Sequence, residues 1–205
     1  MNTVPFYLGP REGEIIPKFR NYANNVEGIV VVLDALGMKN ALEDYTPEDV
    51  FDRWNKVIHE FEYTISALGK NAIFRVFSDT IIITYSNNGY QTPDVLINNL
   101  CNVLINNFIY GIKNGIPFRG AMSYGPYHES SELVLGYAIN QAANCYEKGE
   151  WIGISWSPNI QMPKSNGKPI SYYPLIEYNI PYKDRKIVGL ALNWVFHNNS
   201  IDCSL

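Results

Sequence analysis

Two aspartates stand beside runs of apolar residues, and their type and placement could support metal chemistry. Asp34 follows the apolar run 30–33, and Asp79 lies between the apolar segments 72–77 and 80–85. A lone carboxylate beside a buried strand is rare, because taking its charge out of water is costly unless a partner compensates. A divalent cation would satisfy both acids at once. Magnesium held by two carboxylates commonly faces substrate phosphates.

Each aspartate also has an ordinary structural interpretation. Asp34 could cap a turn at the end of a strand, and Asp79 could form an Asx turn within a hairpin. At positions predicted to converge, a shared metal pair is favoured over two turn acids. Gly37 follows three residues after Asp34, and the loop 36–40 could direct its backbone N–H groups towards a phosphate. Lys39 could add positive charge there or be a solvated loop lysine.

The elements that must position these acids can be predicted from hydrophobic spacing and from turn residues. The near-continuous apolar run 28–36 predicts a strand buried on both faces, hence central in its sheet. Thr-Pro followed by an acid opens two helices, at Thr46 and at Thr92. In chain order we predict strand 28–36, a helix from Pro47 to Gly69, strands 72–77 and 80–85, a helix from Pro93 to Gly115, strand 117–124, a helix from Gly136 to Lys148, and strands 152–155, 170–178 and 186–195.

This order predicts an α+β sandwich, with helices on one face of a mainly antiparallel sheet. In that layout the end of the first strand and the tip of the hairpin become neighbours, which brings Asp34 and Asp79 together. A chain of 205 residues is expected to form one principal domain. We predict an N-terminal lead-in segment over 1–26, a single domain over 27–197 and a frayed tail over 198–205.

Composition excludes several classes of function. The formal net charge of −4 argues against a nucleic-acid partner. The three cysteines are widely spaced and odd in number, which argues against a disulfide framework or zinc site and fits a reducing cytoplasm. No apolar run approaches the roughly 20 residues needed to cross a bilayer, and residues 1–26 lack a signal-peptide core. We therefore expect a soluble cytoplasmic protein without a membrane partner.

Three further polar residues are candidates for binding. Arg119, within an apolar strand, needs an anionic partner: a phosphate suits its fork geometry, and a structural ion pair is the alternative. Arg75 lies four residues before Asp79 on the same strand face. It could contact a carbonyl edge of a base, or pair with an acid across the sheet. Asn140, in the helix that follows Gly136, could orient a ribose or phosphate, or lie on the helix surface.

Four ordered blocks together resemble the catalytic domain of class III nucleotide cyclases. They are Asp34 with Gly37, the hairpin acid in Ser78-Asp79, the strand from Arg119 to Gly125, and the segment from Gly136 to Ala143. The resemblance covers about residues 28–156. It implies a ferredoxin-like, palm-type cyclase domain that works as a homodimer with its sites at the subunit interface.

The resemblance also implies roles for individual residues around the metals and the triphosphate. Asp34 and Asp79 would hold two Mg²⁺ or Mn²⁺ ions, helped by the carbonyl of Ala35. Backbone amides of the following loop would face the triphosphate, and Arg119 would approach it. The residues presenting those amides would be Leu36, Gly37 and Met38.

The sugar and base positions are where the chain departs from the family. Asn140 would position the ribose from the opposite subunit, and Arg75 matches the position where adenylate cyclases place a base-reading lysine. The transition-state arginine expected four residues after Asn140 is Asn144. The second base-reading position is Leu133, whose side chain cannot hydrogen-bond a base.

These departures look most like the Pycsar antiphage pyrimidine (uridylate/cytidylate) cyclases. An arginine only donates, so Arg75 would suit uracil O4 better than the amino edge of adenine. We therefore prefer UTP, with CTP second, as the substrate of a cyclase forming the 3′,5′-cyclic monophosphate and pyrophosphate by two-metal catalysis, as an antiphage second messenger. Asn144 and Leu133 favour the alternative of a catalytically degenerate nucleotide-binding or interaction module. A palm-type polymerase or oligonucleotide cyclase is a third possibility.

Overall fold

The computed structural model describes residues 26–38, 45–87, 89, 91–130, 133–158 and 174–195. The predicted lead-in, apart from Val26, and the predicted tail lie outside the described residues, as does Lys39. The domain boundaries therefore stay predictions.

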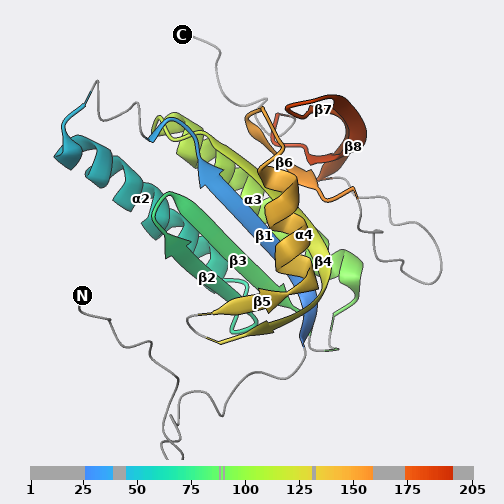
Figure 1. The fold of residues 1–205 in the computed structure, drawn as a ribbon. Helices are drawn as coiled ribbons and strands as arrows, with labels where there is room; N and C mark the ends of the chain where they lie inside the picture. Colours follow the sequence, from blue (N-terminus) through green and yellow to red (C-terminus); the bar gives the residue numbers. More distant parts are fainter. Residues whose placement is uncertain are drawn as a thin grey trace, which may run out of the picture.

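The described residues form one eight-stranded sheet of order β2-β3-β1-β4-β6-β8-β7, with β5 paired to β4 (Figure 1). Its strands are β1 Val26–Ala35, β2 Ala72–Phe77, β3 Thr80–Ser86, β4 Phe118–Glu129, β5 Val134–Gly136, β6 Gly153–Trp156, β7 Leu175–Pro181 and β8 Lys186–Leu192. Every neighbouring pair is antiparallel except β4 and β6. The predicted central, buried first strand and mainly antiparallel sheet are confirmed.

Within the described residues three helices pack on this sheet: α2 Pro47–Ser66, α3 Pro93–Lys113 and α4 Tyr137–Tyr146. The N-cap of α2 is formed as predicted, because the Thr46 hydroxyl accepts the Asp49 N–H at 3.2 Å. Helices α2 and α3 cover one face of the sheet (Figure 1). The expectation that all helices share one face is wrong for α4, which packs on the opposite face.

The two-residue period of β1 divides the core between these faces. Ile29, Val31 and Leu33 belong to the large core that contains the buried residues of α2 and α3. Val30 packs with Ala138 of α4 on the other side. Because side chains alternate, Asp34 lies on the same face as Val30, which is the face that α4 covers only in part.

Among the described residues, α3 is long and apolar enough to cross a bilayer by length and composition. Half of its most apolar window is buried inside the fold, against the sheet. The pattern of α3 is therefore that of a core helix.

The predicted and observed elements differ most at β4 and β5. Strand β4 continues five residues beyond the predicted end at Tyr124, because Tyr127 to Glu129 pair with Val134 to Gly136. That short strand, β5, was not predicted, and only its last residue, Gly136, fell within a predicted element, as the first residue of the helix. The hairpin is stabilised by cross-strand pairing, which hydrophobic periodicity in three residues does not reveal.

Candidate active site

Asp34 stands near the carboxyl end of β1, flanked by two antiparallel neighbours. In the sheet register it pairs with Thr80 of β3 on one side and with Arg119 of β4 on the other. Residues opposite one another across a ladder put their side chains on the same face. The fold therefore brings a carboxylate and a guanidinium from positions 85 residues apart onto one surface.

Asp79 is the second residue of the two-residue turn that joins β2 to β3. The first residue, Ser78, adopts a positive φ of 56°, which glycine usually provides in such hairpins. The Asp79 carbonyl accepts the Ala35 N–H at 2.9 Å. This bond fastens the hairpin tip to the end of β1, as the sequence predicted.

Asp34 and Asp79 both line one open pocket of about 360 Å³. The remaining lining residues are Ala35, Leu36, Gly37, Met38 and Arg119. All the predicted metal-binding residues, all three predicted phosphate-facing residues and Arg119 therefore surround a single space. Its volume falls within the roughly 300–1,000 Å³ typical of ligand sites.

Arg119 is bound to Asp34 in this structure. Its Nη2 lies 2.8 Å from Asp34 Oδ2, and its Nε donates to the same oxygen at 2.9 Å. A third guanidinium nitrogen, Nη1, donates to the Gly149 carbonyl at 3.3 Å. The structural ion pair that the sequence left open is present, and it engages one of the two Asp34 oxygens.

Tyr146, at the end of α4, is close enough to this pocket for the pocket charges to affect its phenol. Burial raises the pKa of its phenol, the negative charges of Asp34, Glu147 and Asp79 act in the same direction, and Arg119 opposes them. The two aspartates therefore both act on one phenol, which stays protonated at neutral pH. The Arg119 guanidinium lies 5.9 Å from the centre of the Tyr146 ring.

The three predicted phosphate-facing amides are not equivalent. The Leu36 N–H already donates to the Pro117 carbonyl at 2.8 Å. This bond removes Leu36 from the predicted set of free amides. Gly37 follows with a positive φ of 80° and open space around its Cα, so a left-handed turn carries the backbone of Gly37 and Met38 along the pocket.

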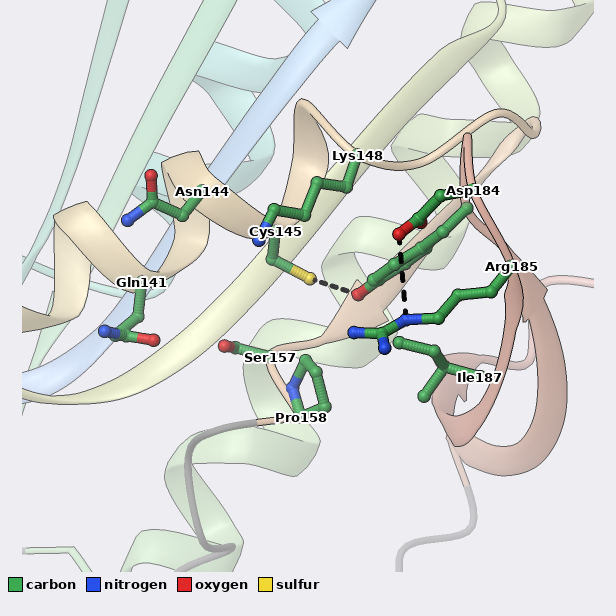
Figure 2. Close-up of a pocket in the computed structure, with 10 residues that line it drawn as sticks. Gln141, Asn144, Cys145, Lys148, Ser157, Pro158, Asp184, Arg185 and Ile187 are labelled. Carbon is green, nitrogen blue, oxygen red and sulfur yellow. Dashed lines mark hydrogen bonds and ion pairs between the residues drawn. The ribbon is translucent and has the colours of Figure 1, made fainter.

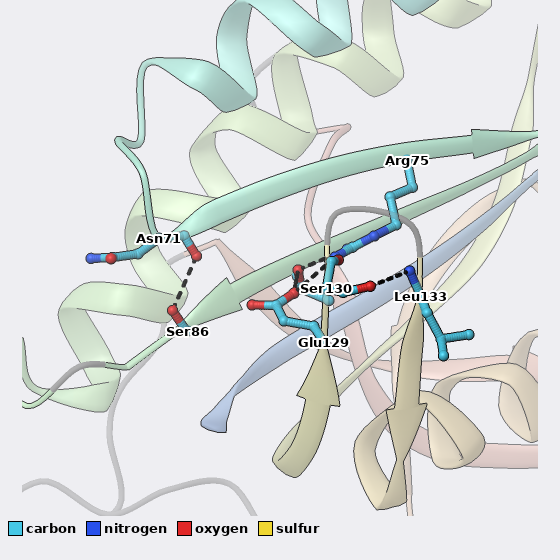
Figure 3. A network of polar contacts seen from close by, with 7 residues as sticks. Asn71, Arg75, Ser86, Glu129, Ser130 and Leu133 are labelled. Carbon is cyan, nitrogen blue, oxygen red and sulfur yellow. Dashed lines mark hydrogen bonds and ion pairs between the residues drawn. The ribbon is translucent and has the colours of Figure 1, made fainter. Parts of the chain in front are cut away.

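Arg75, on β2, lies on the same face of the sheet as Asp34, in a cluster of polar side chains (Figure 3). Its Nη2 contacts Glu129 Oε2 at 3.2 Å and the Ser130 carbonyl, and its Nη1 donates to the Thr84 hydroxyl. The side chains of Arg75 and Glu129 are only 11 % and 10 % exposed. Of the two interpretations offered by the sequence, the structure contains the ion pair across the sheet.

Glu129 is the residue that sequence reasoning missed in this cluster. Its carboxylate also accepts the Thr84 hydroxyl. Glu129 lies 54 residues from Arg75, in the part of β4 that was not predicted. No local signal in the sequence pairs the two residues.

The other two predicted substrate positions are placed differently. Leu133 lies on the turn next to Arg75, with its side chain 39 % exposed and its N–H bonded to Ser130 Oγ. The two predicted base-reading positions are therefore neighbours. Asn140 is exposed on α4 and does not line the pocket of Asp34 and Asp79. The fold of one chain does not bring Asn140 to the acids.

Comparison with known proteins reveals similarity at the level of the fold. No protein-family profile and no curated protein matches the sequence. Among solved structures, the guanylate cyclase domain of RhGC from Catenaria anguillulae in complex with GTP superposes with a TM-score of 0.57 at 16% identity, covering 83% of this chain and 98% of that one. The adenylyl cyclase CyaB from P. aeruginosa gives 0.59 at 12% identity, with 82% and 94% covered.

A monomeric double mutant of the guanylyl cyclase domain of the RhoGC fusion protein, from the aquatic fungus Blastocladiella emersonii, gives a TM-score of 0.60 at 14% identity. It covers 83% of this chain and 97% of that one. The chain has the nucleotide cyclase fold. These solved structures are adenylyl and guanylyl cyclases, so they extend the resemblance to class III cyclases without bearing on the pyrimidine subgroup.

The carboxylates of this pocket suit a metal ion that the protein binds only in part. Within the described ranges no group of three or more His, Cys, Asp or Glu side chains is placed to hold a metal. Two carboxylates remain, Asp34 and Asp79, with the Ala35 backbone beside them. Mg²⁺ is commonly bound by one or two carboxylates together with waters and substrate phosphates, so the residues fit Mg²⁺ or Mn²⁺ bound as a nucleotide complex.

Proposed function

We propose that the chain is a nucleotide cyclase, which converts a nucleoside triphosphate to its 3′,5′-cyclic monophosphate and pyrophosphate. The observation that carries this proposal is the single pocket that Asp34 and Asp79 share with the turn at Gly37. In the reaction the ribose 3′-oxygen forms a bond to the α-phosphorus, the bond from that phosphorus to the β-phosphate oxygen breaks, and the 3′-hydroxyl proton passes to solvent.

The chain's own residues would mainly position the substrate. Two divalent cations, when bound, would activate the 3′-oxygen and neutralise the departing pyrophosphate. Asp34 and Asp79 would hold them, and Arg119 would keep the Asp34 carboxylate oriented through Oδ2. Of the predicted amides we assign only those of Gly37 and Met38 to the phosphates, since the Leu36 N–H is occupied.

For the base we propose a pyrimidine, with UTP preferred and CTP second. Arg75 supplies donors only, and Leu133 beside it supplies no side-chain polar group. A carbonyl-bearing base edge is therefore the better complement to this cluster. Because Arg75 is bound to Glu129, its guanidinium would already have a fixed orientation when the base binds.

We further propose that the enzyme is a cytoplasmic homodimer. In support, Asn140 is exposed on α4 outside the pocket of its own chain, where a second copy could use it. The role of the cyclic product as an antiphage messenger follows from the Pycsar resemblance alone and stays a prediction.

The experiment that tests the proposal is incubation of the purified protein with each of the four NTPs and Mn²⁺, followed by mass analysis of the products. We expect cyclic UMP as the main product. Asp79→Asn should reduce its formation by more than about 100-fold, whereas the exposed Asp52→Asn on α2 should leave it unchanged. Absence of any cyclic product from folded protein would count against the proposal, and linked dinucleotides would point to an oligonucleotide cyclase.

One second candidate deserves the same experiment: a cyclase-fold module that binds a nucleotide without turnover. The observation in its favour is that Asp34 and Arg75 are both engaged in ion pairs within the chain, while the transition-state position holds Asn144. Calorimetry would identify this function by nucleotide affinity without product.

A further inference from the structure

A pocket of about 240 Å³ lies between the turn 36–38, the start of α2 and the connection 115–117 that joins α3 to β4. We call it the α2 pocket. It contains neither Asp34 nor Asp79, and α2 and α3 pack on the opposite face of the sheet from Asp34. It is also separate from the pocket at the end of α4 (Figure 2), which includes Asn144 and so belongs to the proposed nucleotide site.

The walls of the α2 pocket are mainly apolar. Val50 and Ile116 are 8% and 4% exposed, and Leu36, Met38 and Pro117 line the same space. Apolar walls with few polar groups are typical of small-molecule sites. The volume lies below the roughly 300 Å³ at which pockets for drug-sized molecules begin, so a whole nucleotide is too large and a small apolar body fits.

Arg53 is the only charged side chain among the described residues that line this pocket. Its guanidinium carbon lies 4.2 Å from the centre of the Tyr45 ring. A Cβ placed on Gly115 would lie 3.4 Å from Arg53 Nη1. Tyr45 and Gly115 both line the pocket, so these contacts place the guanidinium at its wall.

The guanidinium of Arg53 is available to an anion. Among the described residues no carboxylate forms an ion pair with it. Asp49, one helical turn earlier, accepts the Thr46 hydroxyl at 2.8 Å instead. A guanidinium above an aromatic face keeps N–H donors free at its edge, and a fork of such donors matches a carboxylate.

The turn 36–38 connects the α2 pocket to the proposed active site, because it lines both pockets. The Leu36 N–H donates to the Pro117 carbonyl at 2.8 Å, which fastens the turn to the connection 115–117. A ligand packed against Leu36 and Met38 would therefore contact the same turn whose Gly37 and Met38 amides we assign to the phosphates.

We propose that the α2 pocket binds a small monocarboxylate with an apolar body, and that this ligand regulates the neighbouring site. The carboxylate pairs with Arg53, and the apolar body packs on Val50 and Ile116. By holding the turn 36–38 the ligand changes the affinity of the other pocket for a nucleotide. Only this regulatory step rests on the proposed function.

The binding site is tested by fluorine NMR titration of the full chain with para-fluorobenzoate, in EDTA and without nucleotide. The amide para-fluorobenzamide is the neutral probe of nearly the same shape. We expect the wild type to bind the carboxylate about tenfold more tightly than the amide, because only the carboxylate forms charge-assisted bonds. Arg53→Gln should abolish this difference by weakening the carboxylate alone.

Lys56→Gln is the matched control, since Lys56 is an exposed cation of α2 that does not line the pocket. It should leave the affinity for both probes unchanged, and circular dichroism checks that each variant is folded. Absence of carboxylate binding, equal binding of the two probes by wild type, or equal binding of the carboxylate by wild type and Arg53→Gln would overturn the proposed site.

The regulatory step is tested by repeating the titration with Mn²⁺ and a 3′-deoxynucleoside triphosphate in place of EDTA. We expect the affinity for para-fluorobenzoate to change by about fivefold or more, and the probe to change the nucleotide affinity by the same factor. An unchanged affinity, with nucleotide bound, overturns the regulation. Failure of the nucleotide to bind when the probe is absent counts instead against the proposed function.

Discussion

At the scale of single residues, the arrangement of Asp34 is the most consequential. Two guanidinium nitrogens of Arg119 contact one of its oxygens, Oδ2. Such charge-assisted bonds fix the orientation of a carboxylate. The acid is thus held in place by a residue from the neighbouring strand, and its Oδ1 is the oxygen through which a cation can approach.

Ser78 is a residue whose type conflicts with its backbone conformation, and this conflict can be measured. At a positive φ of 56° a non-glycine residue is disfavoured by about 1 kcal/mol. Ser78→Gly should therefore stabilise the protein, by about 0.5 kcal/mol after the greater unfolded-state freedom of glycine is included. Urea denaturation measures the difference.

Ser66→Gly, at the last residue of α2, is the control with a helical backbone, and it also removes the hydrogen bond that the Ser66 hydroxyl donates to the Tyr63 carbonyl. It should destabilise the protein by about 0.5–1 kcal/mol. If Ser78→Gly lowers the free energy of unfolding as much as Ser66→Gly does, the positive φ at Ser78 does not strain the hairpin.

At the scale of elements, the hairpin of β4 and β5 is attached to β2 and β3 through the pair of Arg75 and Glu129. Both side chains are nearly buried, so removing one leaves an uncompensated charge. Glu129→Ala should lower the free energy of unfolding by about 3 kcal/mol. The double variant that adds Arg75→Ala should lose less unfolding free energy than the two single variants lose together. The difference should be about 1 kcal/mol or more.

The exposed pair of Asp184 and Arg185 provides a control cycle for the same measurement by urea denaturation. Its coupling free energy should be close to zero, because water screens both charges. Strict additivity of the Arg75 and Glu129 changes would mean that the hairpin is not held by this pair.

Local chemistry made many elements predictable. The Thr-Pro openings located α2 and α3, and the two polar residues between apolar runs located the hairpin that carries Asp79. From these elements alone the meeting of Asp34 and Asp79 could be anticipated. The contacts between strands could not be predicted. The ion pair of Glu129 with Arg75 and the hydrogen bond from the Leu36 N–H to the Pro117 carbonyl depend on sheet register, which a single sequence does not encode locally.

At the scale of the whole molecule, α2 and α3 pack on one face of the sheet, and α4 covers only part of the other. The acids, Arg119 and Arg75 all belong to the second face, and exposed Phe77 is next to them at 80% exposure. A single exposed aromatic side chain is ordinary on a protein surface, so Phe77 does not by itself mark an interface. In the proposed homodimer it would be one of the side chains that the second subunit covers.

The proposed dimer predicts complementation between two inactive variants. Asp79→Asn lacks a metal-binding carboxylate, and Asn140→Ala lacks the ribose contact given to the other subunit. Unfolding and refolding the two together should form heterodimers in which one site is intact, restoring about a quarter of wild-type activity. Each variant refolded alone is the control, and a mixture no more active than either variant would argue against sites shared between subunits.

The central claim is that Asp34 and Asp79 jointly hold divalent cations that arrive with a triphosphate. Electron paramagnetic resonance of Mn²⁺, titrated into protein with a non-cyclisable 3′-deoxynucleoside triphosphate, counts those ions directly. We expect two bound Mn²⁺ per site in wild type and in Asp52→Asn, weak binding without nucleotide, and loss of bound metal in Asp79→Asn. Unchanged Mn²⁺ binding in both Asp34→Asn and Asp79→Asn would contradict the account.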